Sequence, residues 1–214
     1  MVRQVRTAVQ RMFSGTSTVS TAMFAVLTVL VSGSLAGQAG VRVRIVTDSG
    51  AITVALSPDK APGTVANFLR YVDEKRYDGG SFYRAVTLQN QLPAAQQPQI
   101  EVIQGGIDAD SSRRLPPIPH ETNDRSSIKH TDGVISMARG APGSASSEFF
   151  FVINNQPSLD FGGKRNPDGQ GFAAFGVVVD GMDVVRRIQR MPSAGAPPQR
   201  MITTVRIQSV TRLP

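Results

Sequence analysis

Hydrophobic and polar residues alternate where the folded part of the chain begins. Residues 41–46 read VRVRIV, and a second alternating run over residues 52–56 follows the polar turn Asp48-Ser49-Gly50. A period of two places every second side chain on one face of a strand, and a short glycine-containing turn between two such runs is typical of a hairpin. The pattern therefore predicts an antiparallel hairpin with one buried face, which ends at Pro58.

The period of the apolar residues changes after Thr64. Four of them fall at positions i, i+3, i+4 and i+7, which is one side of a helix: Val65, Phe68, Leu69 and Val72. Thr64 is the predicted N-cap, and Asp78-Gly79-Gly80 ends the segment. A second, shorter helix is predicted from Met182, with the segment 180–183 as its cap. Two amphipathic helices are thus expected to pack against a sheet.

Short apolar segments separated by turns fill most of the remaining chain. The predicted strands, besides the hairpin, are residues 81–86, 100–104, 134–138, 149–153, 172–179 and 201–210. Between them lie a segment without period, Thr87 to Gln99, interpreted as an exposed loop, and a polar excursion from Asp108 to Asp132. About eight short strands with few helices favour a closed barrel or a sandwich, because closure removes exposed edges.

The stretch from Gly133 to Phe151, GVISMARGAPGSASSEFFF, is the centre of this pattern. An apolar strand leads into a loop of small residues, and three consecutive phenylalanines begin the next strand. Small loop residues allow a close approach of the backbone to another molecule, and aromatic residues in such density are rarely left in water. The stretch is either an ordinary hairpin over a core or the edge of a binding site.

The first 39 residues differ from the rest. Arg3, Arg6 and Arg11 precede an apolar stretch at residues 22–31, which is followed by small residues without any acidic group. This is the order of a signal peptide, with cleavage after Ala36 or Ala39. We expect residues 1–39 to be removed and residues 40–214 to form one exported domain, periplasmic or secreted. The apolar stretch is shorter than the roughly 20 residues that span a bilayer, so stable membrane insertion is expected only as an anchor if cleavage fails.

Charge and composition exclude several functions. The formal charge of +7 falls to +4 when the three arginines of the signal peptide leave, which is too little to argue for nucleic acid. The absence of cysteine excludes a disulfide framework and thiolate chemistry, and it suits an oxidising compartment. Two histidines without cysteine argue against a metal site, and no Gly-x-Ser-x-Gly elbow or phosphate-binding fingerprint occurs. We expect no metal and no cofactor.

Several short motifs together resemble the cyclophilin family. They are Phe82-Tyr83-Arg84, Gln104-Gly105-Gly106, Gly133 to Ala138, Ser147 to Phe150, Leu159-Asp160 and Phe175-Gly176, in the family's order and approximate spacing from about Val41 to Arg212. The resemblance implies a mainly β fold, a closed eight-stranded antiparallel barrel capped by two α-helices. It also implies peptidyl-prolyl cis-trans isomerase activity on proline-containing polypeptides, here assisting the folding of exported proteins, by a monomer.

The resemblance also assigns roles to individual residues. Arg84 matches the catalytic arginine, which can donate to the proline nitrogen or steady the carbonyl oxygen, and Gln104 matches the residue that orients it. Positions lining the proline pocket correspond to Val102, Phe150, Leu159 and Phe172. Ala138 and the backbone of Arg139 match the rim that pairs with the substrate chain, and Glu148 stands beside the pocket.

The chain departs from the family pattern at five places, one of which is Val102, smaller than the usual methionine. Glu101 replaces a pocket phenylalanine, which predicts either one polar wall or a shift of the strand. Glu148 replaces a glutamine, which predicts a carboxylate able to pair with Arg84 and compete with substrate. Ser158 replaces the tryptophan of cyclosporin-sensitive relatives, so weak cyclosporin binding is expected. The loop from Thr87 to Gln99 is longer than usual and is expected to cover part of the groove.

Two other functions fit the same residues. Glu101 and the long polar loop suggest a cyclophilin-fold module that binds proline peptides or acts as a chaperone with little or no turnover. The excursion from Asp108 to Asp132 suggests a structural or assembly protein that docks through this segment. Isomerisation without a nucleophile, metal or cofactor remains the leading hypothesis.

Overall fold

The computed structural model describes residues 40–107 and 110–214. The predicted signal peptide, residues 1–39, lies outside the described residues, so its assignment stays a prediction. Among the residues described, no helix combines the length and the apolar character needed to cross a membrane.

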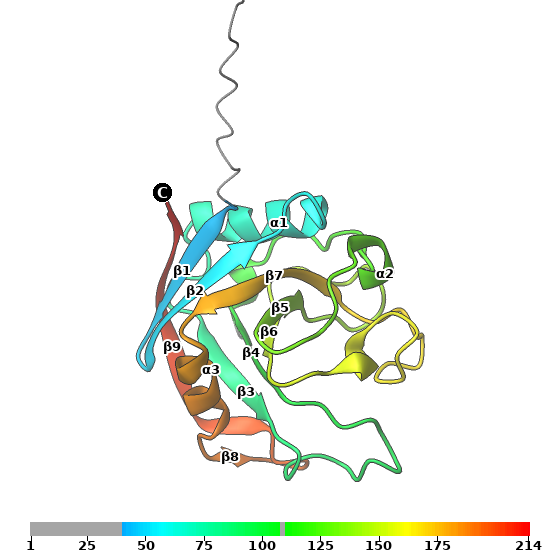
Figure 1. The fold of residues 1–214 in the computed structure, drawn as a ribbon. Helices are drawn as coiled ribbons and strands as arrows, with labels where there is room; N and C mark the ends of the chain where they lie inside the picture. The colour runs from blue at the N-terminus through cyan, green and yellow to red at the C-terminus, as the bar shows by residue number, and fades with distance from the viewer. Residues whose placement is uncertain (1–39, 108–109) are drawn as a thin grey trace, which may run out of the picture. The chain divides into compact units, whose positions relative to one another are not determined.

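Eight antiparallel strands close into a barrel (Figure 1). They are β1 (Arg42–Thr47), β2 (Gly50–Leu56), β3 (Ser81–Val86), β4 (Val102–Gly106), β5 (Val134–Met137), β6 (Phe149–Val152), β7 (Ala173–Asp180) and β9 (Arg200–Leu213). Their order is β1-β2-β7-β5-β6-β4-β3-β9, and pairing of β1 with β9 closes the ring. A two-residue strand, β8 (Ser193–Ala194), pairs only with β9. The predicted fold class is confirmed.

Three α-helices accompany the barrel in the described part of the chain, rather than the two predicted. α1 (Pro62–Asp73) buries the predicted apolar side and contacts β7 and β9, while α3 (Met182–Gln189) contacts β2, β3 and β4. The additional helix, α2 (Asn123–Ser126), is a single turn inside the polar excursion. Four residues are too few to show a helical period, which is why the sequence pattern did not reveal it.

The predicted N-cap of the first helix, Thr64, is wrong, whereas the segment 180–183 contains the N-cap of the second helix as predicted. α1 begins at Pro62, after Ala61, and its first turn is capped by a distant carboxylate: Glu121 accepts from the backbone N–H groups of Gly63 at 2.9 Å and Thr64 at 2.7 Å. A carboxylate there also complements the positive end of the helix dipole. α3 has Gly181 as its N-cap, without a side-chain hydrogen bond. A Cβ at this position would lie 2.4 Å from the backbone oxygen of Ala51, so only glycine fits.

The three phenylalanines of β6 divide the apolar residues into two clusters. Phe149 and Phe151 point into the main core between the barrel and α1, whereas Phe150 belongs to a separate cluster with Val102 and Leu159. Alternation along the strand produces this division, because neighbouring side chains face opposite sides of a sheet. The Phe150 cluster marks the outer face of the barrel on which the site is built.

Candidate active site

A β-bulge in β3 brings two neighbouring side chains to the same face. Phe82 pairs with Gly105 and Arg84 pairs with Gln104, so Tyr83 is an extra residue in the ladder. A bulge interrupts the alternation of a strand and redirects side chains. Tyr83 and Arg84 are therefore both half-buried on the groove side, between the fully buried Phe82 and Ala85.

Two glutamines hold the guanidinium of Arg84. Its Nη1 donates to Gln104 Oε1 at 2.9 Å, and its Nε and Nη2 donate to Gln199 Oε1 at 3.1 and 2.6 Å. Both acceptors are neutral, and Arg84 forms no ion pair with any residue that the structure describes. Burial lowers the pKa of Arg84 from its ordinary value, but a guanidinium stays charged at neutral pH. Three of its five N–H donors are used, which leaves one on Nη1 and one on Nη2.

Gln104 links this arginine to a second set of polar groups. Its Nε2 donates to the hydroxyl of Tyr83 at 2.8 Å, and that hydroxyl donates to Glu148 Oε2 at 2.8 Å. The chain of hydrogen bonds fixes the orientation of the Gln104 amide, with its oxygen toward Arg84. The predicted pairing of Glu148 with Arg84 is wrong, because the carboxylate binds the hydroxyl groups of Tyr83 and Ser147 instead.

Below the guanidinium lies a pocket of about 480 Å³ with an apolar floor. Phe150 and Leu159 are 5% and 1% exposed, and Val102 is equally buried beside them. The ring of Phe172 meets that of Phe150 edge-on, with 5.3 Å between centroids. Edge-to-face packing of this kind stabilises a fixed ring arrangement. The floor is therefore shaped to receive a small apolar ring.

A buried polar cluster supports the floor from behind. The ring of His130 stacks on Phe150 with 6.2 Å between centroids, and its Nδ1 and Nε2 contact Asp160 Oδ1 at 2.8 Å and Ser136 Oγ at 3.1 Å. Burial, the largest influence on Asp160, would raise the pKa of that carboxyl, but the hydrogen bonds and charge of His130 leave the pKa below its ordinary value. The cluster fixes the position of Phe150.

Arg139 supports the rim through its side chain as well as its backbone. Its guanidinium binds both carboxylate oxygens of Asp168 at 2.8 Å, donates to the backbone oxygen of Gly171, and lies 5.2 Å from the centroid of Phe172. The hydrogen bonds from Arg139 lower the pKa of Asp168 to about 2. A bidentate pair of this geometry is among the stronger polar contacts in proteins. It joins the rim to the loop before β7.

The structure brings all nine predicted site residues to this one pocket. They are Arg84, Val102, Gln104, Ala138, Arg139, Glu148, Phe150, Leu159 and Phe172. Their chemical roles stay predictions. The proximity of Arg84 and Phe150 is the geometry on which the catalytic assignment depends.

Three other expectations have different outcomes. The polar wall predicted from Glu101 is wrong: its carboxylate accepts from Asn154 Nδ2 at 2.7 Å, and Ile100 lines the pocket instead. The loop of residues 87–99 contributes Gln97 to one end of the pocket. Ser158 does not line the pocket, and weak cyclosporin binding stays a prediction.

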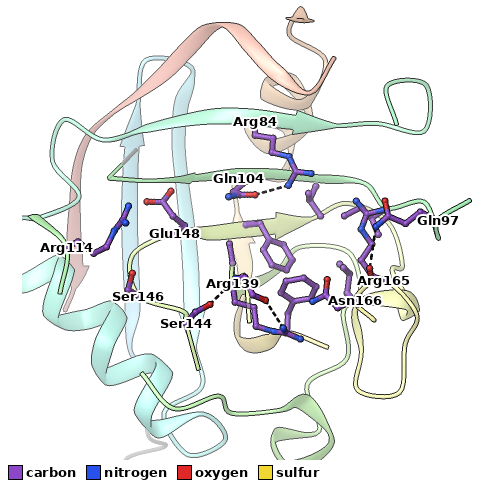
Figure 2. Close-up of a pocket in the computed structure, with 17 residues that line it drawn as sticks. Arg84, Gln97, Gln104, Arg114, Arg139, Ser144, Ser146, Glu148, Arg165 and Asn166 are labelled. Carbon is purple, nitrogen blue, oxygen red and sulfur yellow. Dashed lines mark hydrogen bonds between the residues drawn. The ribbon is translucent and has the colours of Figure 1, made fainter. Parts of the chain in front are cut away.

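Several lining residues were missed by the sequence analysis. Figure 2 shows Gln97, Arg165 and Asn166 at one end of the pocket, with Arg114 and Ser146 at the other. Gln199, which holds Arg84, comes from the segment between β8 and β9. No period or motif marks these positions. Tyr83 alone had a signal, since it lies inside the motif that contains Arg84.

The arrangement suits catalysis in which a bound group is held in position and charge that develops on it is stabilised by a nearby cation. A cation with two unused N–H donors faces a pocket that holds an apolar ring. Such donors stabilise electron density that develops on a nearby oxygen or nitrogen. Within residues 40–107 and 110–214 no three His, Asp or Glu side chains gather closely enough to hold a metal ion.

Comparison with known proteins agrees with this geometry. The family model described as "Cyclophilin type peptidyl-prolyl cis-trans isomerase/CLD" matches residues 42–212. Peptidyl-prolyl cis-trans isomerase A of Dickeya dadantii is 31% identical over 185 residues, covering 83% of this chain and 88% of that protein. Peptidyl-prolyl cis-trans isomerase B of Escherichia coli is 33% identical over 144 residues, covering 67% of this chain and 80% of that protein.

A solved structure is similar in fold. A cyclophilin type peptidyl-prolyl cis-trans isomerase from Cryptosporidium parvum superposes with a TM-score of 0.64 at 20% identity, covering 81% of this chain and 98% of that chain. At this identity the likeness concerns the barrel and its topology.

Proposed function

The chain belongs to the cyclophilin-type peptidyl-prolyl cis-trans isomerase family, and from that premise we propose that Arg84, Gln104 and the Phe150 pocket catalyse rotation about X-Pro bonds in exported polypeptides. The observation that supports the site is the placement of the Arg84 guanidinium and the Phe150 floor in the same pocket.

The reaction needs neither a nucleophile nor a metal. Rotation about a peptide bond faces a barrier of about 18–20 kcal/mol, because resonance gives the C–N bond partial double-bond character. The two isomers of an X-Pro bond are close in energy but interconvert over tens to hundreds of seconds. A catalyst must bind the twisted state, in which resonance is lost, more tightly than either planar isomer.

The site residues divide this task between them. The apolar floor formed by Phe150, Val102 and Leu159 holds the proline ring, while the carbonyl before it rotates. The unused N–H groups of Arg84 donate to the proline nitrogen, whose lone pair becomes available as resonance is lost, or to the carbonyl oxygen. Gln104 keeps the guanidinium in place, and Ala138 with the backbone of Arg139 binds the substrate chain along the rim.

Substitution of Arg84 tests the catalytic assignment. We expect Arg84→Ala to lower kcat/KM by roughly 10²–10³-fold, as loss of a donor to a transition state does in other enzymes. Arg84→Lys should have a kcat/KM little higher than that of Arg84→Ala, because an ammonium lacks the planar fork that binds both glutamines. Exchange of an Ala-Pro peptide measured by NMR provides the rates, with Arg44→Ala, an exposed arginine of β1, as the control. Equal turnover by the wild type and Arg84→Ala would rule out the role of Arg84.

The same measurement separates catalysis from binding. A module that binds proline peptides without turnover would shift peptide resonances on addition of protein and leave the cis-trans exchange rate unchanged. We expect faster exchange. The site is assembled from residues of one chain, which supports action as a monomer.

Export of the protein is the second part of the proposal. It is supported by the basic and apolar residues of the first 39 positions, which have the order of a signal peptide. Expression of the full chain in a bacterial host, followed by fractionation and N-terminal sequencing, should find a periplasmic or secreted product that begins after Ala36 or Ala39. Full-length protein retained in the cytoplasm would contradict export, and full-length protein in the membrane fraction would indicate an anchor.

A further inference from the structure

Two surface loops meet at one end of the pocket and fix the position of Arg165. Its Nη1 donates to the backbone oxygen of Pro98 at 2.7 Å, and its backbone N–H donates to the oxygen of Ser158 at 3.1 Å. Gln97 Nε2 in turn contacts the backbone oxygen of Arg165 at 3.4 Å. Arg165 is therefore attached to both the 87–99 loop and the segment before Leu159, although it lies in a glycine-rich loop itself.

The charge of Arg165 has no counter-ion within the described residues. Arg139, on the neighbouring rim, is neutralised by Asp168, but neither Arg165 nor Arg84 forms an ion pair there. Glu148 is the only acidic residue that lines the described pocket, and its carboxylate binds Tyr83. Positive charge is therefore in excess at the end of the pocket that Figure 2 shows beside Gln97 and Asn166.

The two arginines are close enough to affect each other. Burial, and after it the charge of Arg84, lowers the pKa of Arg165. Like charges in a partly buried pocket repel each other, and an anion placed near both relieves that repulsion. Asn166 Nδ2, which is buried at the same end, has no hydrogen-bond partner among the described residues. The end of the pocket thus carries positive charge, and an amide donor without a partner in the described chain is buried in its wall.

We propose that Arg165 selects proline segments that carry an aspartate or glutamate directly beside the proline. The inference rests on the proposed function, because it places the proline ring on the Phe150 floor and the neighbouring side chain at the Arg165 end. Arg165 is half-buried, so an ion pair there is screened less than on an open surface. One such pair corresponds to a preference of roughly five- to tenfold.

Matched peptides test the preference. Peptides with Glu, Gln or Lys immediately before or immediately after the proline are compared by NMR exchange at low salt. For the wild type we expect kcat/KM to be roughly five- to tenfold higher for Glu than for the isosteric Gln at one of the two positions, and lowest for Lys. The preference should shrink at high salt, since an ion pair is screened.

Variants of Arg165 identify the group responsible. In Arg165→Gln, kcat/KM for the Glu peptide should be about equal to kcat/KM for the Gln peptide. Arg165→Glu should reverse the order, so that the Lys peptide has the highest kcat/KM. Arg165→Lys should keep part of the preference for Glu. Arg44→Gln, on the exposed face of β1, is the matched control and should keep all of it. Circular dichroism verifies the fold of each variant.

The outcomes distinguish this inference from the proposed function. A wild type that isomerises Gln, Glu and Lys peptides equally, or a Glu preference that survives in Arg165→Gln, overturns the role of Arg165 and leaves the isomerase assignment intact. A wild type that accelerates none of the peptides defeats the proposed function and this inference with it.

Discussion

At the scale of single residues, the position of one guanidinium depends on two amide oxygens. Gln104 and Gln199 accept three hydrogen bonds from Arg84 between them, and neither adds a charge that would neutralise it. Aspartate or glutamate at either position would hold the arginine as firmly. Its negative charge would, however, weaken the electrostatic stabilisation that the guanidinium gives to electron density developing on the substrate. Neutral acceptors therefore combine fixed geometry with a full positive charge.

Gln199→Ala tests whether this second amide positions Arg84. Hydrogen bonds to charged groups contribute about 1.5–3 kcal/mol, so kcat should fall roughly ten- to a hundredfold while KM changes little. Gln208→Ala, at an exposed glutamine on β9, is the control. A rise in KM with unchanged kcat would mean that Gln199 contributes only to binding. Rates come from peptide exchange, and thermal melting tests for loss of fold.

At the scale of elements, strands and helices that the local sequence predicts depend on contacts with segments distant in the sequence. The bulge at Tyr83 gives β3 its two groove-facing side chains, and Gly105 permits the close pairing of β3 with β4. A Cβ on Gly105 would lie 2.7 Å from the backbone oxygen of Ser81. α1 likewise begins where Pro62 fixes the backbone, and its free N–H groups are satisfied by Glu121, 57 and 58 positions away.

Glu121→Ala should destabilise the protein by about 0.5–2 kcal/mol, the usual effect of removing an N-cap. Thr64→Val is the informative comparison, because the Thr64 hydroxyl is buried without a partner in the described chain. Its replacement by an isosteric methyl group should be nearly neutral or slightly stabilising. Urea unfolding followed by circular dichroism gives both values. If Thr64→Val lowered the free energy of unfolding more than Glu121→Ala does, Thr64 rather than Glu121 would be the residue that caps α1.

At the scale of the whole molecule, ion pairs between distant segments hold the pocket together. Arg139 follows β5 and Asp168 precedes β7, so their pair joins two loops around the rim. Asp160 connects α2 to the same region, since its Oδ1 accepts from Asn123 Nδ2 and from the backbone N–H of His130. The barrel provides the frame, and these contacts fix the loops that surround the site.

The Arg139 and Asp168 pair predicts how stability depends on pH. The pKa of Asp168 is lowered to about 2, so the ion pair adds stability that is complete above the unfolded pKa of about 3.9 and is lost as pH falls toward 2. Asp168→Asn should melt at a lower temperature than the wild type at pH 7, and the difference should shrink between pH 4 and pH 2. Asp59→Asn, an exposed carboxylate without an ion pair in the described chain, is the control. A difference independent of pH would contradict the role of the charge.

The sequence by itself predicted most strand positions and both long helices, because side-chain periodicity is a local property. Its resemblance to the cyclophilin family, carried by motifs a few residues long, predicted the closed barrel and nine of the residues that line the pocket. Only the tertiary structure decided that Glu148 binds Tyr83, that Gln199 holds Arg84 from 115 positions away, and that Arg165 reaches the pocket. Closure of the barrel and a bulge in one strand bring these groups together. Neither feature produces a periodic pattern of residues in the sequence from which it could be predicted.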